Sequence, residues 1–176
     1  MRRRGLIALA LLPLGACGFR PLYGDAPAGQ AANTASGDLA ATRVNLIADR
    51  EGQLIRRALV QRLGSDRGAP AQYQLSVRVT IRRDQVAVQQ DQTETRNRVT
   101  AVAEFVLQPV APPDAIVTSG RAIAVDAFNV GTDQYFAAQL SGEAAMQRIA
   151  ERLAEDISGQ LAAFYARRRQ ATARAS

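Results

Sequence analysis

Residues 73–81 read YQLSVRVTI, and this stretch decides the fold class. Its apolar side chains occupy every second position: Tyr73, Leu75, Val77, Val79 and Ile81. A period of two residues is typical of a β-strand with one buried face and one solvated face. The apolar positions change parity at Val86 and Val88. We therefore expect a bulge or bend near residues 82–85, because a slip of one residue moves every side chain to the other face.

A second strand with the same alternation follows. Its apolar side chains are Val99, Ala101, Ala103, Phe105 and Leu107, and Pro109 ends the pattern. The polar residues 89–97 between the two strands predict a long hairpin loop, and residues 111–114 predict a turn. Two strands joined in this way pair in antiparallel fashion.

Two more strands are expected at the ends of this region. Residues 116–128 predict a strand in which Val117, Ile123 and Val125 share one face. Upstream, the alternation of Val44, Leu46 and Ala48 predicts a first short strand. These assignments bring the number of expected strands to four.

The remaining apolar patterns have helical spacing. A first helix is expected from about Glu51 to Leu63, with Gly64 as its stop. A long closing helix carries an apolar stripe at spacings of three and four: Met146, Ile149, Leu153, Ile157, Leu161 and Phe164. Ser141 suits its start, and Arg167, Arg168 and Arg169 suit its last turn, where positive charge complements the helix dipole.

The order β-α-β-β-β-α predicts an α+β fold. We expect a two-layer sandwich, in which a mostly antiparallel four-stranded sheet carries two helices on one face. Residues 41–168 would form this single domain, and residues 169–176 a C-terminal tail. Residues 17–40 are rich in Ala, Gly, Pro and polar side chains, which predicts a flexible tether.

The first 16 residues have the pattern of a secretory signal peptide. Arg2, Arg3 and Arg4 precede a short apolar run over residues 5–14, and small residues then precede Cys17, the only cysteine. This junction is similar to a bacterial lipobox, which predicts cleavage before Cys17 and lipidation of its sulfur. Ordinary cleavage beside an unrelated cysteine is the alternative. Gly18 favours the outer membrane, because Asp at this position marks inner-membrane retention in some bacteria.

Composition disfavours most kinds of enzyme. The chain has no His, and its single Cys is assigned to the anchor, so a Ser-His-Asp triad and zinc sites built on His or Cys are excluded. We expect no catalytic residue, no metal and no cofactor. The net charge of +6 overstates the basicity of the mature protein, because three of the 22 basic residues leave with the signal.

Arginines gather around the expected hairpin. Arg82 and Arg83 end one strand, and Arg96 and Arg98 begin the next. If the hairpin brings these four together, their paired N–H donors suit phosphate groups. The alternative is a solvated strand face that discourages aggregation. Nearby acids, such as Asp84, have no catalytic partner.

Residues 17–23, which read CGFRPLY, resemble the mature start of the lipopolysaccharide-assembly lipoprotein LptE, and in particular its alphaproteobacterial branch. The order of the elements, the run Glu94-Thr95-Arg96 and the closing helix with Arg148, Leu153 and Ile157 are also similar to that family. The resemblance extends over nearly the whole chain.

The resemblance implies a function at the outer membrane. Members of this family plug the large β-barrel LptD, and the pair delivers lipopolysaccharide to the outer leaflet. The expected partners are therefore an LptD-type barrel, lipopolysaccharide and, through the lipid anchor, the outer membrane, with the protein on the periplasmic side and in the barrel lumen. The resemblance also implies lipopolysaccharide contact through basic residues near the hairpin, and the candidates are Arg82, Arg83, Arg96 and Arg98.

A second function remains open from the sequence. The chain would also suit a periplasm-facing lipoprotein that binds peptidoglycan or serves an envelope transporter as an accessory subunit. A lipid-anchored envelope protein would not meet nucleic acid, so we expect no DNA or RNA partner.

Overall fold

A computed structural model of the chain describes residues 35–88, 94–113, 115–131 and 135–175. Its helices are α1 (Ala35–Ala40), α2 (Asp49–Leu63) and α3 (Tyr135–Ala175), and its strands are β1 (Thr42–Val44), β2 (Tyr73–Val88), β3 (Glu94–Pro109) and β4 (Thr118–Gly131). The expected signal peptide, Cys17 and most of the expected tether lie outside the described residues.

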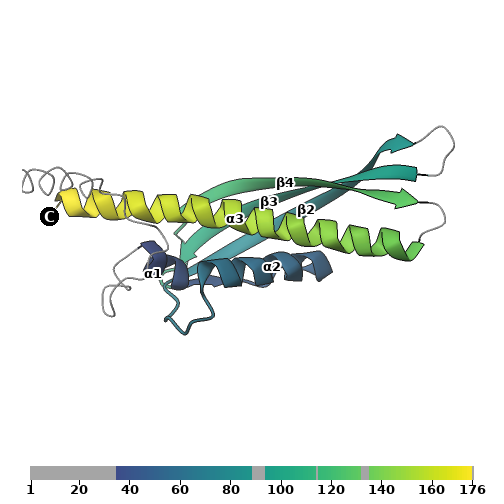
Figure 1. Cartoon of the computed structure of the whole chain (residues 1–176). Helices are drawn as coiled ribbons and strands as arrows, with labels where there is room; N and C mark the ends of the chain where they lie inside the picture. Colours follow the sequence, from purple (N-terminus) through teal and green to yellow (C-terminus); the bar gives the residue numbers. More distant parts are fainter. Residues whose placement is uncertain (1–34, 89–93, 114, 132–134, 176) are drawn as a thin grey trace, which may run out of the picture.

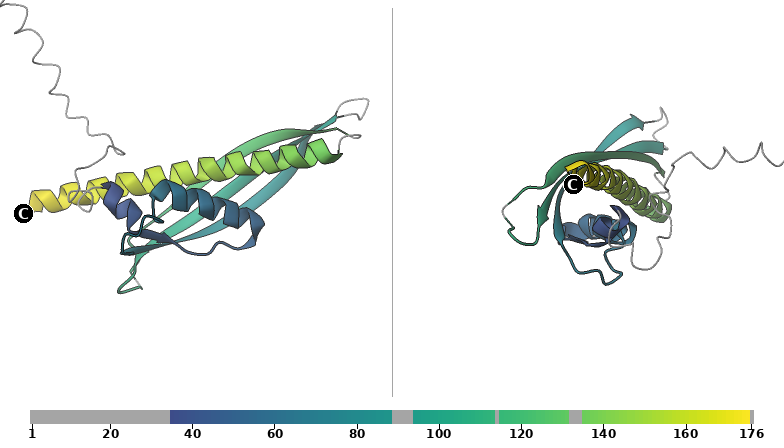
Figure 2. Two further views of the ribbon diagram at one scale, coloured as in Figure 1. Left: turned by 60° about the horizontal axis from the view of Figure 1, so that its bottom comes forward. Right: turned by 90° about the vertical axis from the view of Figure 1, so that its left-hand side faces the viewer.

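The strands form one four-stranded sheet in the order β1-β2-β3-β4. The pairs β2–β3 and β3–β4 are antiparallel. β1 is parallel to β2, because α2 connects them as a crossover. α2 and α3 lie side by side on one face of the sheet, which curves around them (Figures 1 and 2). The expected α+β sandwich is therefore confirmed, with a mixed sheet. We call the face toward these helices the inner face and the opposite face the outer face.

The inner face of β2 and β3 follows the predicted alternation. Leu75 on β2 and the five residues of β3 that were expected on this face, from Val99 to Leu107 at every second position, are buried, while Val77, Val79 and Ile81 are half-buried. The register shifts between Gln85 and Ala87, which confirms the expected irregularity. The expected loop over residues 89–97 is too long, because β3 begins at Glu94.

Ile123 and Val125 share one face of β4, as expected, and that face is the outer one. Ala122 and Ala124 are buried on the inner face, whereas Ile123 is 55% and Val125 45% exposed on the outer face. Small residues are needed on the inner face because α3 packs closely against β4. Gly120 shows the same constraint, since a Cβ there would lie 2.5 Å from the ring of Phe105 on β3.

The first strand is shorter than expected. β1 ends at Val44, and the chain then turns so that Leu46 is 81% exposed while Ile47 is buried. Leu46 and Ala48 therefore do not extend the buried face of the strand. Before β1, residues assigned to the tether form α1, which buries Leu39 against the core.

Both main helices extend beyond their expected starts. α2 begins at Asp49 and ends at Leu63, and it is capped by Gly64, whose φ of 69° is the left-handed conformation that glycine adopts readily. α3 begins at Tyr135, six residues before Ser141, and continues through Ala175, where a tail was expected. Its stripe from Met146 to Leu161 is buried, but Phe164 is half-buried and Tyr165 takes the core position. No helix in the described residues is both long and apolar enough to cross a membrane.

The C-terminal half of α3 contacts α1 and β1 through hydrogen bonds and an ion pair. Thr42 donates to the carbonyl of Asp38, so the buried hydroxyl of Tyr165, 2.8 Å from Thr42 Oγ1, is the donor to that oxygen. Burial raises the pKa of Tyr165, and the hydrogen bond to Thr42 opposes that rise. Arg169 pairs with Asp38 at 2.7 Å. We call this region the α1 end, and the opposite end, where β2 and β3 are connected, the hairpin end (Figure 1).

Candidate binding surface at the hairpin end

Arg82 and Arg98 lie together on the outer face of the sheet. Arg82 is opposite Thr100 on β3, and Arg98 is two residues from Thr100 on that strand. Diagonal neighbours of this kind lie about 7–8 Å apart, within reach of two long side chains that bind one ligand. Both side chains are exposed, and neither has an ion pair among the described residues. Two of the four expected arginines thus form a cluster.

Arg83 lies on the inner face and is already paired. Its Nη2 is 2.8 Å from Oε1 of Glu51, in the first turn of α2. The backbone N–H of Glu51 and then the hydrogen bond from Arg83 lower the pKa of this carboxyl. The expectation that the hairpin gathers all four arginines is wrong here, because consecutive strand residues point to opposite faces.

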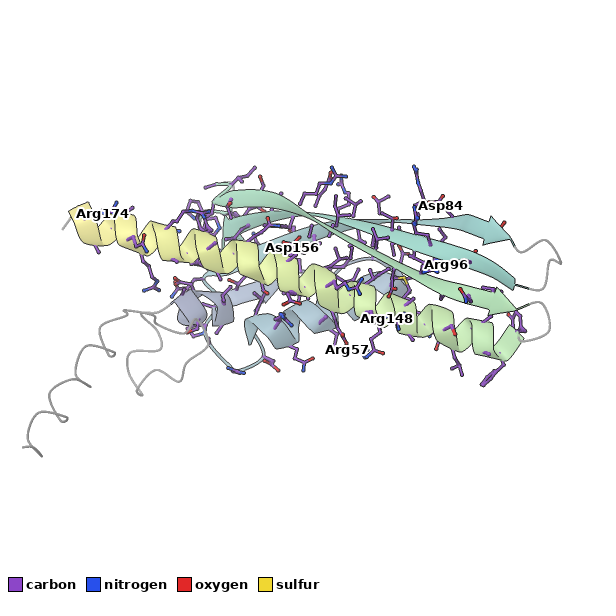
Figure 3. The ribbon with its side chains drawn as sticks, turned by 45° about the horizontal axis from the view of Figure 1, so that its top comes forward. Arg57, Asp84, Arg96, Arg148, Asp156 and Arg174 are labelled. Carbon is purple, nitrogen blue, oxygen red and sulfur yellow. The ribbon has the colours of Figure 1, made fainter. Side chains whose placement is uncertain are left out.

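Arg96 lies two residues before Arg98 on β3 and opposite Asn129 of β4, so it belongs to the same outer face as Arg98. It lines a groove of about 430 Å³ together with Asn129 of β4 and Ser141 and Arg148 of α3. Figure 3 shows Asp84 and Arg96 at the hairpin end and Arg174 far away at the other end of α3. Three of the four expected arginines, Arg82, Arg96 and Arg98, therefore lie on the outer face, and Arg83 lies on the inner face.

A network that the sequence did not reveal connects α3 to β4. Nε of Arg148 is 2.7 Å from Oδ2 of Asp126, whose Oδ1 accepts from the N–H of Ala127. Desolvation of Asp126 raises its pKa, but the hydrogen bond from Arg148 and that from the Ala127 N–H outweigh it, so the pKa is lowered overall. The spacing of Arg148 and Arg152 by four residues was a signal of one helix face, but nothing indicated what that face meets.

The outer face combines arginines with exposed apolar residues. One row across the strands is Arg78, Glu104 and Arg121, and the next is Thr80, Val102 and Ile123. The row after that is Arg82, Thr100 and Val125. Cationic and apolar side chains therefore adjoin on one side of the sheet, which suits a ligand or a surface with both anionic and apolar parts.

A second groove lies on the inner side. It has a volume of about 400 Å³, with Leu54, Val99 and Met146 among its apolar lining residues. The ion pairs Arg50–Glu143 and Arg83–Glu51 stand at its rim. The charges at this rim cancel, so the groove does not select an anion.

No group of three or more His, Cys, Asp or Glu side chains in the described part of the chain is placed to hold a metal ion. Asp126, for example, forms an ion pair with Arg148, and Arg152 and Gln160 donate to backbone carbonyls.

Comparison with known proteins establishes the fold. No family model matches the chain, and no curated protein matches its sequence. Among solved structures, a candidate lipoprotein from Caulobacter crescentus is similar with a TM-score of 0.63 and 22% identity, over 75% of this chain and 96% of that one.

Two further solved structures share the fold at lower similarity. A minor lipoprotein from Acinetobacter baumannii has a TM-score of 0.51 and 12% identity, over 69% of this chain and 91% of that one. The rare lipoprotein B from Shewanella oneidensis has a TM-score of 0.50 and 12% identity, over 69% and 93%. At such identities the likeness extends to the fold alone.

Proposed function

We propose that this chain is a non-enzymatic lipoprotein of the outer membrane that plugs an LptD-type β-barrel and takes part in delivering lipopolysaccharide to the outer leaflet. The observation that carries the proposal is the outer face, where Arg82 and Arg98 adjoin exposed Val125 and Ile123. Lipopolysaccharide combines phosphates with acyl chains, so both kinds of side chain have a counterpart in it.

Lipid anchoring is supported by the sequence and by the similar structures. Cys17 follows a basic start, a short apolar run and two small residues. The three proteins that share the fold are themselves described as lipoproteins. Diacylation provides the second lipid signal that stable anchoring needs, because one chain gives only marginal binding.

The shape and polarity of the fold support the plug. Large outer-membrane barrels have polar lumens. The described fold is elongated (Figure 1), and its outer face carries Arg78, Arg82, Arg98 and Arg121. The described chain begins at Ala35, at the α1 end, so the hairpin end is the end farther from this point.

Co-purification tests the proposal. The tagged full-length chain, extracted from the outer membrane in mild detergent, should retain one very large barrel protein through size exclusion. Recovery with peptidoglycan or with an inner-membrane transporter instead would contradict the plug and favour the alternative function of a periplasm-facing accessory lipoprotein.

The anchor has its own test. Wild-type chain should incorporate a labelled fatty acid during growth, and Cys17→Ala should not, because the substitution removes the thiol to which the lipid attaches. Equal labelling of the Cys17→Ala chain would show that the lipid is attached elsewhere or that the junction is not a lipobox.

A further inference from the structure

β4 is an edge strand of the sheet, and side chains of α3 hydrogen-bond to backbone groups along its free edge. Nη1 of Arg152 donates to the carbonyl of Val125 at 2.7 Å, and Nε2 of Gln160 donates to the carbonyl of Arg121 at 2.9 Å. The N–H of Ala127 is satisfied by the carboxylate of Asp126. An unpaired strand edge is a template for pairing with another chain. On β4, side chains of α3 already bind two of these edge carbonyls.

The opposite edge of the sheet is different. β1 pairs only with Tyr73–Leu75, and the last hydrogen bond along this edge runs from the N–H of Asn45 to the carbonyl of Leu75. Backbone groups of alternate strand residues point to the same side, so those of Val77, Val79 and Ile81 continue this edge. Within the described residues, no group hydrogen-bonds to the backbone of Val77, Val79 or Ile81 on this edge. We call these three residues the β2 edge.

Side chains beside the β2 edge differ between the two faces. On the inner face Val77, Val79 and Ile81 are half-buried and pack against the core. On the outer face Arg78 and Arg82 are exposed and have no ion pair within the described part of the chain. The edge therefore presents backbone donors and acceptors between an apolar strip and two positive charges.

We propose that the β2 edge binds an extended segment of a partner protein by strand addition. The segment carries carboxylates opposite Arg78 and Arg82, hence four residues apart, and apolar side chains at the two positions between them that face the inner side. Main-chain hydrogen bonds give such complexes affinity, and alternate side chains give them specificity. The charge of the two arginines selects an acidic segment.

A second copy of this chain is disfavoured as the occupant. Pairing of two β2 edges would bring Arg78 and Arg82 of both copies onto one face, where like charges repel. The inference goes beyond the proposed function, because it requires neither the lipid anchor nor lipopolysaccharide. Failure of strand addition would therefore leave the plug untouched, and the reverse also holds.

Amide hydrogen exchange of the full-length chain tests the proposal, with the acetylated and amidated peptide Thr-Glu-Val-Thr-Val-Glu-Thr as the probe. Without peptide, the N–H groups of Val79 and Ile81 should exchange quickly, while that of Thr80, which faces β3, should be slow. Peptide at about 90% occupancy should slow the edge amides about tenfold, because only the free edge then exchanges. Edge amides that are already slow without peptide, or that do not respond to it, would overturn the proposal.

Two variants assign binding to the edge and to its charge. Val79→Pro removes an edge-facing N–H and leaves the β3 side intact, which an edge strand tolerates. It should weaken peptide binding about tenfold, the equivalent of one hydrogen bond. Arg82→Glu should weaken binding of this peptide. It should strengthen binding of a second peptide, in which Lys replaces only the Glu that lies opposite residue 82.

The matched control is Arg121→Glu, which reverses a charge on the same outer face but beside the closed edge of β4. It should bind both peptides as the wild type does. Equal loss in the Arg82→Glu and Arg121→Glu chains would overturn the proposal, as would unchanged binding to Val79→Pro. Protection of the edge that rises with protein concentration in the absence of peptide would assign the edge to a second copy. If Val79→Pro does not fold, the charge-swapped peptide still decides.

Discussion

The two ends of the molecule are built from different interactions. At the α1 end the aromatic ring of Tyr165 is 1% exposed, stands 5.4 Å from the ring of Tyr73, and hydrogen-bonds to buried Thr42. At the hairpin end the contacts between α2, α3 and the sheet include the ion pair Arg50–Glu143, in which both side chains are exposed, and Arg148–Asp126, in which the arginine is exposed. The buried contacts are independent of salt, whereas exposed ion pairs are screened by it. At the α1 end the ion pair Arg169–Asp38 adds to the buried contacts.

This contrast suggests that the α1 end provides stability and that the hairpin end provides ligand contacts. Burial of large side chains fixes the α1 end, where the chain enters the fold after the proposed anchor. Exposed ion pairs contribute little to stability, about 0–1 kcal/mol each. The hairpin end therefore keeps charged groups available for a ligand without a large loss in the free energy of unfolding.

The largest expected effect is on stability at the α1 end. Tyr165→Ala should lower the free energy of unfolding by about 3–5 kcal/mol, because it leaves a cavity among fully buried residues. The matched substitution at the hairpin end, Phe128→Ala, should cost about 1–2 kcal/mol, since Phe128 is only half-buried. Urea denaturation measures both, and equal losses would abolish the contrast.

A smaller effect isolates the hydroxyl of Tyr165. Tyr165→Phe should cost about 1–3 kcal/mol, because Thr42 Oγ1 loses its donor in a buried site. Tyr73→Phe is the control, since it removes a hydroxyl that accepts from Arg168 in an exposed contact and should cost under about 0.5 kcal/mol. If the two variants melt at the same temperature, the buried hydrogen bond does not hold this end.

The hairpin end should also respond to acid. Asp126 and Glu51 have lowered pKa values in the folded protein, so their contribution to stability is present above the unfolded pKa and is lost as pH falls through the folded pKa. Stability should therefore decline below about pH 4. Asp126→Asn should flatten this decline, as measured by urea midpoints between pH 6 and pH 3. An unchanged pH profile for this variant would contradict the role of Asp126.

How far the sequence predicted the fold can be seen on two strands. The alternation on β3 was predicted correctly because the buried face carries the large residues Val99, Phe105 and Leu107 as well as two alanines. On β4 the more apolar residues Ile123 and Val125 share a face, but that face is exposed, and the alanines are the residues buried beside α3. Close helix packing selects small residues, and a periodicity argument that weighs hydrophobicity alone cannot detect it.

The candidate surface was predicted in part for a related reason. Position along the chain placed Arg82 and Arg83 together, but the pleat of the strand separates them onto two faces. The partnership of Arg148 with Asp126 depends on how α3 lies along β4, which local pattern does not encode. Lipidation of Cys17 and contact of lipopolysaccharide with any of these arginines remain predictions.

We expect the outer face at the hairpin end, and not arginine in general, to contact lipopolysaccharide. The direct test is a calorimetric titration of lipopolysaccharide into the Cys17→Ala protein, which lacks the acyl anchor. Arg82→Ala combined with Arg98→Ala should weaken binding at least about tenfold, equivalent to one charge-assisted hydrogen bond. The control, Arg57→Ala combined with Arg174→Ala, removes two exposed arginines from α2 and the far end of α3 and should bind as the parent does. Equal weakening in both double variants, or none in the first, would contradict the claim.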